Sequence, residues 1–130
     1  MTIIQDAKTI VRAHMKAFDT AASDRLIDDG CPAVASDFKW RSMHPFYEKS
    51  GVEAVVSEFW QPLRTSFRNL QRREDVFFGG LNDVDDGQTV WTCSMGHFVG
   101  LFDADLLNIP HTGRLAHLRY AEFLCVHGGR

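Results

Sequence analysis

The residue in this sequence best suited to chemistry is Glu122, a single carboxylate among apolar side chains. Every second residue from 116 to 126 points to one face of an extended strand. Besides Glu122, that face carries Ala116, Leu118, Tyr120, Leu124 and Val126. A carboxylate on such a face is either paired with a cation or has a raised pKa. A raised pKa suits a base that removes a proton next to a carbonyl near neutral pH, whereas the alternative is a structural ion pair with an arginine such as Arg119 or Arg114.

His97 is the second candidate for catalysis. Its alternation places it on a largely apolar face with Trp91, Cys93, Met95, Val99 and Leu101. A neutral imidazole there could donate a hydrogen bond to an enolate oxygen or shuttle a proton. The alternative is a core histidine bonded to a backbone carbonyl. His117 and Arg119 alternate with Glu122 and are therefore expected on the opposite face of their strand.

Aromatic and polar residues elsewhere are candidates for substrate binding, namely Trp40, His44, Trp60, Tyr120 and His111. Trp40 and His44 flank a loop expected at the mouth of a pocket, although the His44-Pro45 pair could instead only shape that loop. Trp60 lies at helical spacing in an apolar stripe, where a core role is the alternative. His111 belongs to an expected loop that could form part of a lid.

No metal or cofactor is expected. The six histidines lack H-x-x-x-H spacing, and the sequence contains neither a glycine-rich phosphate loop nor G-x-S-x-G. The three cysteines show no C-x-x-C pair, which is typical of free thiols in a reducing compartment, so a cytoplasmic protein is expected.

Composition limits the possible partners. Of 130 residues, 45% are hydrophobic and 24% charged, which is typical of a globular domain. The net charge of −3 provides no basic surface for nucleic acid. No apolar run approaches the ~20 residues that span a bilayer, so no membrane segment is expected.

Helices are expected in the first half of the chain. Apolar residues recur on one face over residues 3–18 and, with the clearest helical period, over residues 51–67, where Pro62 is expected to introduce a kink. Between them we expect a short helix over 23–29, a strand over 34–41 and a loop over 43–51.

Long strands are expected in the second half. They cover residues 70–81, 89–102 and 115–126, separated by a turn at 82–87 and a loop at 103–113. Helices followed by paired strands indicate a single α+β domain over residues 1–130. Because these strands exceed the usual ~5–6 residues, the sheet should curve strongly, with bends or bulges at Gly79, Gly80, Gly96 and Gly100.

Three stretches resemble the SnoaL-like polyketide cyclases of the nuclear-transport-factor-two-like superfamily. They are WRSMHPFYEKSGVEAVVSEFWQPL, GHFVGLF with the following PHTGR, and LAHLRYAEFLCVHGGR. The resemblance implies a cone-shaped, curved antiparallel sheet packed on N-terminal helices around one pocket. It places Glu122 where the family carries an acid/base residue, usually aspartate, for an intramolecular aldol closure.

The function implied is cofactor-independent acid/base chemistry on a small hydrophobic molecule that bears a carbonyl, by a cyclase or an isomerase-type enzyme. The alternative is a non-catalytic binding or dimerisation module of the same fold. The family continues into a last strand after the turn that this chain reaches at its end. Either the chain is a fragment, or a partner covers that edge of the sheet, which favours a homodimer.

Overall fold

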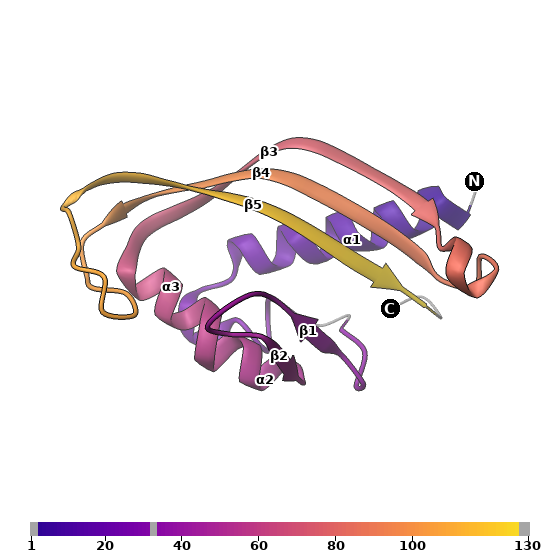
Figure 1. The fold of residues 1–130 in the computed structure, drawn as a ribbon, viewed down its shortest axis with the longest axis horizontal. Coiled ribbons are helices and arrows are strands. Elements are labelled where there is room, and N and C mark those ends of the chain that lie inside the picture. Colours follow the sequence, from indigo (N-terminus) through magenta and orange to yellow (C-terminus); the bar gives the residue numbers. More distant parts are fainter. Residues whose placement is uncertain (1–2, 32–33, 128–130) are drawn as a thin grey trace.

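The structure is a computed structural model that describes residues 3–31 and 34–127. A curved antiparallel sheet arches over a layer of helices (Figure 1). The sheet consists of β3 (Phe67–Leu81), β4 (Val90–Phe102) and β5 (Arg114–Val126). Beneath it lie α1 (Ile3–Thr20), α2 (Val52–Val55), α3 (Gln61–Ser66) and a hairpin of β1 (Lys39–Arg41) and β2 (Glu48–Ser50). The expected α+β fold, with N-terminal helices packed on a curved sheet, is confirmed.

The amphipathic helix α1 anchors the sheet to the lower layer. Its buried residues recur every three or four positions, which is the helical period: Ala7, Val11, Met15 and Phe18. The first three pack with Val90 and Val126, at one end of the sheet, in a single apolar cluster. Phe18 instead joins Leu26 and Val56 in a second cluster, so one face of α1 serves two parts of the core.

The helix predicted over residues 51–67 is present but irregular. It runs from Val52 to Ser66 as α2, a π-helical turn (Val56–Trp60) and α3. The π-turn ends two residues before Pro62, which has no N–H to donate and whose ring crowds the preceding turn. The expected kink therefore takes the form of a local widening of the helix.

The segment between the helices differs from the prediction. The expected strand over 34–41 is reduced to β1, and the expected loop over 43–51 contributes β2, which pairs with β1. The expected helix over 23–29 is a single 3-10 turn (Ser23–Arg25). The sequence predicted a strand over residues 34–41 but did not indicate that its partner strand lies within the loop that follows it.

Two irregularities bend β3 against β4, between Arg68 and Gln71 and between Glu74 and Val76. Gly96 pairs with Glu74 at the second one, where a Cβ atom on Gly96 would lie 2.1 Å from the carbonyl oxygen of Arg73. Only glycine fits so close to a neighbouring backbone.

The four glycines predicted to bend the sheet differ in their roles. Gly100 also lies against β3, since its Cβ would be 3.0 Å from that of Phe67. Gly79 and Gly80 keep regular pairing with β4, so neither position is a bulge.

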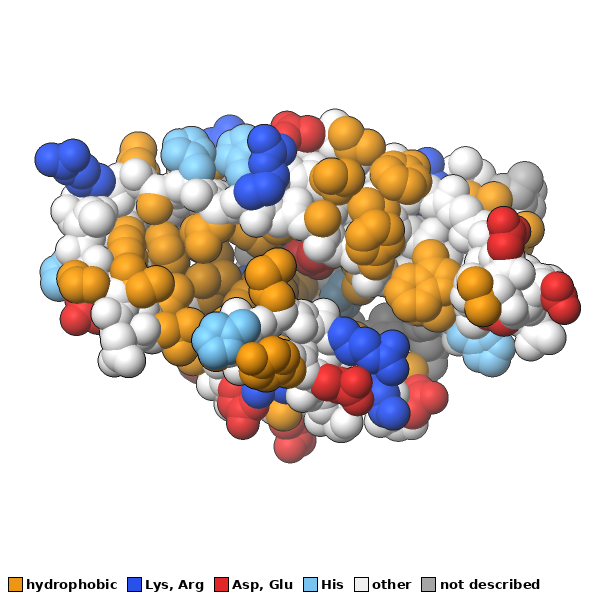
Figure 2. Space-filling view, in the orientation of Figure 1, with side chains coloured by type: hydrophobic (Ala, Val, Ile, Leu, Met, Phe, Trp, Pro, Cys, Tyr) orange, Lys and Arg blue, Asp and Glu red, His pale blue; other side chains and the backbone are white. Residues whose placement is uncertain are grey.

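The inner face of the sheet is incompletely covered. Along β5 the even-numbered residues face inward as predicted, yet Ala116, Leu118, Tyr120, Glu122 and Leu124 are only half-buried. Figure 2 shows the corresponding depression between the sheet and the lower layer, with hydrophobic side chains on its walls. We call this space under β5 the hollow.

In the described part of the chain, β3 and β5 form the two edges of the sheet. Residues 128–130, where the resemblance implied a turn before a further strand, lie outside the described residues. None of the described helices is long and apolar enough to cross a membrane.

Candidate functional site

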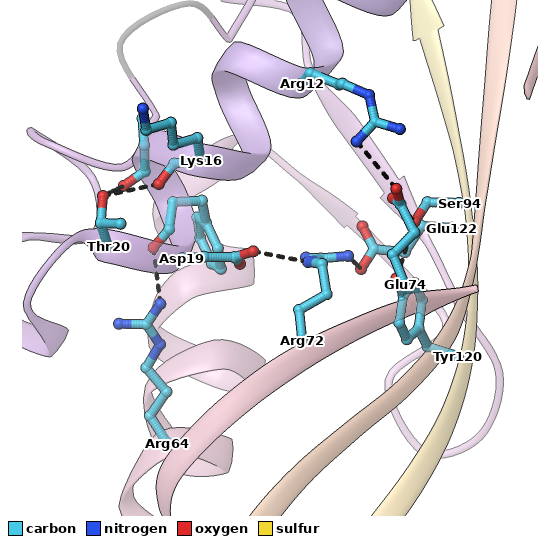
Figure 3. Close-up of polar contacts among 12 residues, drawn as sticks. Arg12, Lys16, Asp19, Thr20, Arg64, Arg72, Glu74, Ser94, Tyr120 and Glu122 are labelled. Carbon is cyan, nitrogen blue, oxygen red and sulfur yellow. Dashed lines mark hydrogen bonds and ion pairs between the residues drawn. The ribbon is translucent and has the colours of Figure 1, made fainter. Parts of the chain in front are cut away.

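The candidate site is built around Arg72 of β3, whose side chain is only 8% exposed. Its Nε lies 2.9 Å from Oδ2 of Asp19 on α1, and its Nη1 lies 2.9 Å from Oε1 of Glu122 on β5 (Figure 3). The guanidinium is 5.0 Å from the ring centroids of both Phe98 and Tyr120. Arg72 is thus held by two carboxylates and two aromatic rings.

A second chain of polar contacts runs beside this pair. Arg12 Nη1 lies 3.0 Å from Oε1 of Glu74. The hydroxyl of Ser94 donates to Oε2 of Glu74 at 2.6 Å and lies 2.9 Å from the hydroxyl of Tyr120. We call the complete set the Arg72 cluster: Arg12, Asp19, Arg72, Glu74, Ser94, Tyr120 and Glu122 (Figure 3).

Simple periodicities bring the cluster together. Arg72 and Glu74 are two residues apart on β3 and share its inner face, as do Tyr120 and Glu122 on β5. Arg12 and Asp19 are seven residues apart on α1, about two turns, and therefore lie on the same side of the helix. The register then places Ser94 of β4 directly opposite Glu122.

Burial dominates the electrostatics of Glu122. Desolvation raises the pKa of its carboxyl, although the charge and the hydrogen bond of Arg72 act in the opposite direction. The negative charges of Asp19 and Glu74 add to the increase. For Arg72, burial alone would lower the pKa, but the charges of Glu122 and Asp19 raise it above its ordinary value. The cluster thus brings two guanidinium groups and three carboxyl groups together.

Aromatic side chains form the apolar wall next to the cluster. Trp60 contacts Phe18, Phe59 and Phe98 at centroid distances of 5.0, 4.8 and 6.0 Å. A cavity of about 20 Å³ lies between this wall and the cluster, lined by Phe18, Asp19, Trp60, Arg64, Leu70, Arg72 and Phe98. Its size is sufficient for about one water molecule, so a larger ligand would have to use the half-open hollow.

The structure brings four of the predicted site residues into one region. Glu122 and Tyr120 belong to the Arg72 cluster, and Trp60 lines the adjacent cavity. Trp40 packs on Phe59, 4.9 Å between centroids, and so extends the same aromatic wall. The alternative interpretation, an ion pair of Glu122 with an arginine, is present in the structure, but the arginine is Arg72 of β3 and neither Arg114 nor Arg119.

Three histidines do not join this region through the contacts described. His97 was expected on an inner, apolar face, but the buried residues of β4 include the even positions and His97 faces outward. It lies beside His117, 5.3 Å between ring centroids, and near Asp75. The strand was assigned the wrong inner face because the outer face also carries large apolar residues.

The two loop histidines contact their own loops. His44 Nδ1 lies 2.8 Å from the hydroxyl of Tyr47. His111 Nδ1 lies 2.6 Å from Asp105, whose pKa this contact lowers. Both histidines are exposed. Neither contact links them to Glu122.

Sequence reasoning missed Arg72 and Asp19, the two residues that hold Glu122. The alternation of Arg72 and Glu74 in one strand was a usable signal, because two opposite charges on an inner face need partners. Nothing local marked Asp19, since its partner is 53 residues away. In the described part of the chain, no group of three or more histidine, cysteine or acidic residues is placed to hold a metal ion.

Comparison with solved structures identifies the fold. A crystal structure from Xanthomonas campestris pv. campestris, described as a "putative polyketide cyclase", matches 99% of this chain and 87% of that chain. The TM-score is 0.62 and the sequence identity 22%. This likeness confirms the cyclase-type fold that the resemblance implied. No family model matches the sequence. No curated protein matches it either.

Proposed function

We propose that this protein binds a small, hydrophobic, carbonyl-bearing molecule in the hollow and that Glu122 acts on it as a general acid/base. The observation that carries this proposal is the position of Glu122. Its carboxyl shares the half-buried inner face of β5 with Leu118 and Leu124, and burial raises its pKa, which is the direction that suits a general base. The fold shared with the Xanthomonas protein supports the same class of chemistry.

In the proposed reaction, the Glu122 carboxylate removes a proton from the carbon next to the ligand carbonyl. The electron pair of the broken C–H bond forms an enolate, whose oxygen accepts hydrogen bonds from Arg72 or Tyr120. This role, first expected of His97, passes to groups on the inner face. In a ring closure, the enolate carbon attacks a second carbonyl of the same molecule, and protonated Glu122 returns the proton to the new alkoxide.

The second candidate function is a binding or dimerisation module without turnover. The Arg72–Glu122 ion pair favours it, because a carboxylate held by a guanidinium is a weaker base than a free one. The hydroxyls of Ser94 and Tyr120 also have partners already.

A homodimer is proposed on the outer face of the sheet. Val76, Phe78, Met95 and Phe123 are between 40% and 65% exposed there. Figure 2 shows hydrophobic side chains gathered in a patch over the strands. A contiguous apolar patch of this kind is typical of an interaction surface. The three free cysteines support a reducing compartment, which we propose is the cytoplasm.

The proposed chemistry is tested by proton exchange on a model ketone. 2-Tetralone is small and hydrophobic, and its acidic α-protons exchange with D₂O when a base removes them. We expect the protein to accelerate this exchange, Glu122→Gln to abolish the acceleration, and the control Glu53→Gln, an exposed glutamate on α2, to retain it. Equal exchange rates for the protein and Glu122→Gln would exclude the acid/base role and leave the binding module.

A further inference from the structure

Arg64 of α3 is bonded to the end of α1, the turn that carries Asp19. Its Nη1 donates to the carbonyl oxygen of Ala21 at 2.7 Å, and its Nη2 donates to that of Phe18 at 2.8 Å. The guanidinium also lies 5.2 Å from the ring centroid of Phe18. The last carbonyls of a helix lack their usual partners within the helix, so they accept hydrogen bonds from elsewhere. Because Asp19 lies between Phe18 and Ala21 in the sequence, one side chain fixes the backbone on both sides of this carboxylate.

Arg64 also provides a charge that α1 does not provide for itself. The last turn of α1, which is described in full, contains no basic residue. A cation at this position stabilises the partial negative charge of a helix C-terminus. Burial lowers the pKa of the Arg64 guanidinium, and the negative charge of Asp19 acts in the opposite direction. Arg64 is therefore a half-buried cation whose described contacts are all with the end of α1.

Asp19 depends on this anchor because water competes for its carboxylate. Its side chain is 33% exposed, whereas that of its partner Arg72 is 8% exposed. Figure 3 shows Arg64 reaching from α3 to the end of α1, and Asp19 extending from that end toward Arg72. All three residues line the same small cavity. Helix ends fray, so a last turn without its anchor would release Asp19 from Arg72 into solvent.

We infer that Arg64 is a positioning residue, which fixes the last turn of α1 so that Asp19 holds Arg72 in place beside Glu122. The contacts run from α3 to α1, from α1 to β3 and from β3 to β5. The proton affinity of Glu122 is thus set in part by a residue that acts through Asp19. The consequence for catalysis rests on the proposed function, whereas the placement of Asp19 does not.

Removal of Arg64 has two effects on Glu122, and they have opposite signs. Loss of a positive charge by itself raises the pKa of a nearby carboxyl. Release of Asp19 lowers the pKa of Glu122, because the negative charge of Asp19 raises it in the intact site. The positioning role therefore predicts a decrease where the loss of charge alone predicts an increase.

The test uses two variants of Arg64, one control and one second background. Arg64→Met removes both hydrogen bonds and keeps most of the apolar volume. Arg64→Lys keeps the charge but lacks the planar fork that bonds two acceptors. The control Arg25→Met removes an exposed arginine from the 3-10 turn that follows α1. Asp19→Ala removes the residue through which Arg64 is inferred to act.

NMR measures the contact and its consequence separately. The Nε–H of Arg72 should exchange with water at least about fivefold faster in both Arg64 variants, because its hydrogen bond to Asp19 is released. Carbon-detected titration should show a lower pKa for Glu122 in both variants. In the Asp19→Ala background, Arg64→Met should neither accelerate that exchange further nor lower the pKa. Arg25→Met should retain the parent values.

Three results would overturn the inference: an unchanged exchange rate of the Arg72 Nε–H in the Arg64 variants, a higher pKa of Glu122 in Arg64→Met, or a full effect of Arg64→Met in the Asp19→Ala background. If Arg64→Met does not fold, Arg64→Lys decides by the same measurements.

Failure of the proposed chemistry is distinguishable from failure of the inference. A protein that does not accelerate tetralone exchange, but shows the expected changes at Arg72 and Glu122, keeps the positioning role and rejects the base. Tetralone exchange that needs Glu122, with a pH profile that Arg64→Lys leaves unchanged, rejects the positioning role alone.

Discussion

The guanidinium of Arg72, on β3, reaches the carboxylate of Glu122, on β5, at 2.9 Å across the intervening strand β4. In the register of the sheet, Arg72 is opposite Phe98, and Glu122 is opposite Ser94. The pair therefore crosses β4 diagonally at Gly96, which contributes no side chain to the crossing. The two edge strands are thus joined by an ion pair as well as by the strand between them.

The proton affinity of Glu122 should respond in opposite directions to its two charged neighbours. Asp19→Asn should lower the pKa of the carboxyl, because the negative charge of Asp19 raises it. Arg72→Met should raise the pKa further, because both the charge and the hydrogen bond that lower it are lost. Carbon-detected NMR titration measures both changes. A shift of the same sign in the two variants would contradict this account of the site.

The free energy of unfolding should depend on pH through the titration of Glu122. Because its pKa is raised by folding, the folded state binds the proton more tightly than the unfolded state. This contribution to the free energy of unfolding is complete below the ordinary pKa of glutamate and is lost as pH rises through the folded-state pKa. Denaturation of Glu122→Gln across pH 4–8 should lack that decline. An identical pH profile in both proteins would refute the raised pKa.

Gly96→Ala should destabilise the protein by about 2–3 kcal/mol, because the new methyl group would lie 2.1 Å from a backbone oxygen of β3. Gly80→Ala is the matched control, since a Cβ there meets nothing within 4 Å and the residue belongs to the same sheet. Urea denaturation of both variants measures the difference. Equal stabilities would show that the irregularity at Glu74 relaxes without cost.

Phe123→Asp should convert the proposed homodimer into a monomer. The side chain is 65% exposed on the outer face of β5, so a charge there costs little in the free subunit and much in an apolar interface. Met43→Asp, at an exposed position near the β1–β2 hairpin, is the control and should leave the mass unchanged. Sedimentation at micromolar concentration distinguishes the two. A monomeric parent protein would exclude the homodimer at that concentration.

Periodicity was sufficient to predict the larger elements. The three long strands, the helix that became α1 and the inward face of β5 all follow from local alternation, and each is confirmed. The assignment failed on β4, where Trp91 and Met95 are apolar but lie on the exposed side, so hydrophobicity alone selected the wrong face for His97. When the outer face of a strand is also apolar, the alternation of apolar and polar residues no longer indicates which face is buried.

The candidate site was predictable only in part. Glu122 could be found because it interrupts an apolar row, but a row within one strand contains no information about which arginine lies opposite. Arg72 comes from a strand 50 residues earlier, and the partner is fixed by the register of β3 on β4.

The edge position of β5 has a consequence for hydrogen exchange. In the described part of the chain, β5 pairs with β4 alone, so its amides alternate between the ladder and the open side of the sheet. Every second amide of β5 should therefore exchange with solvent deuterium rapidly, while those of β4, paired on both sides, remain protected until larger openings occur. Binding of a partner strand along this edge would appear as slowed exchange at the alternate positions of β5.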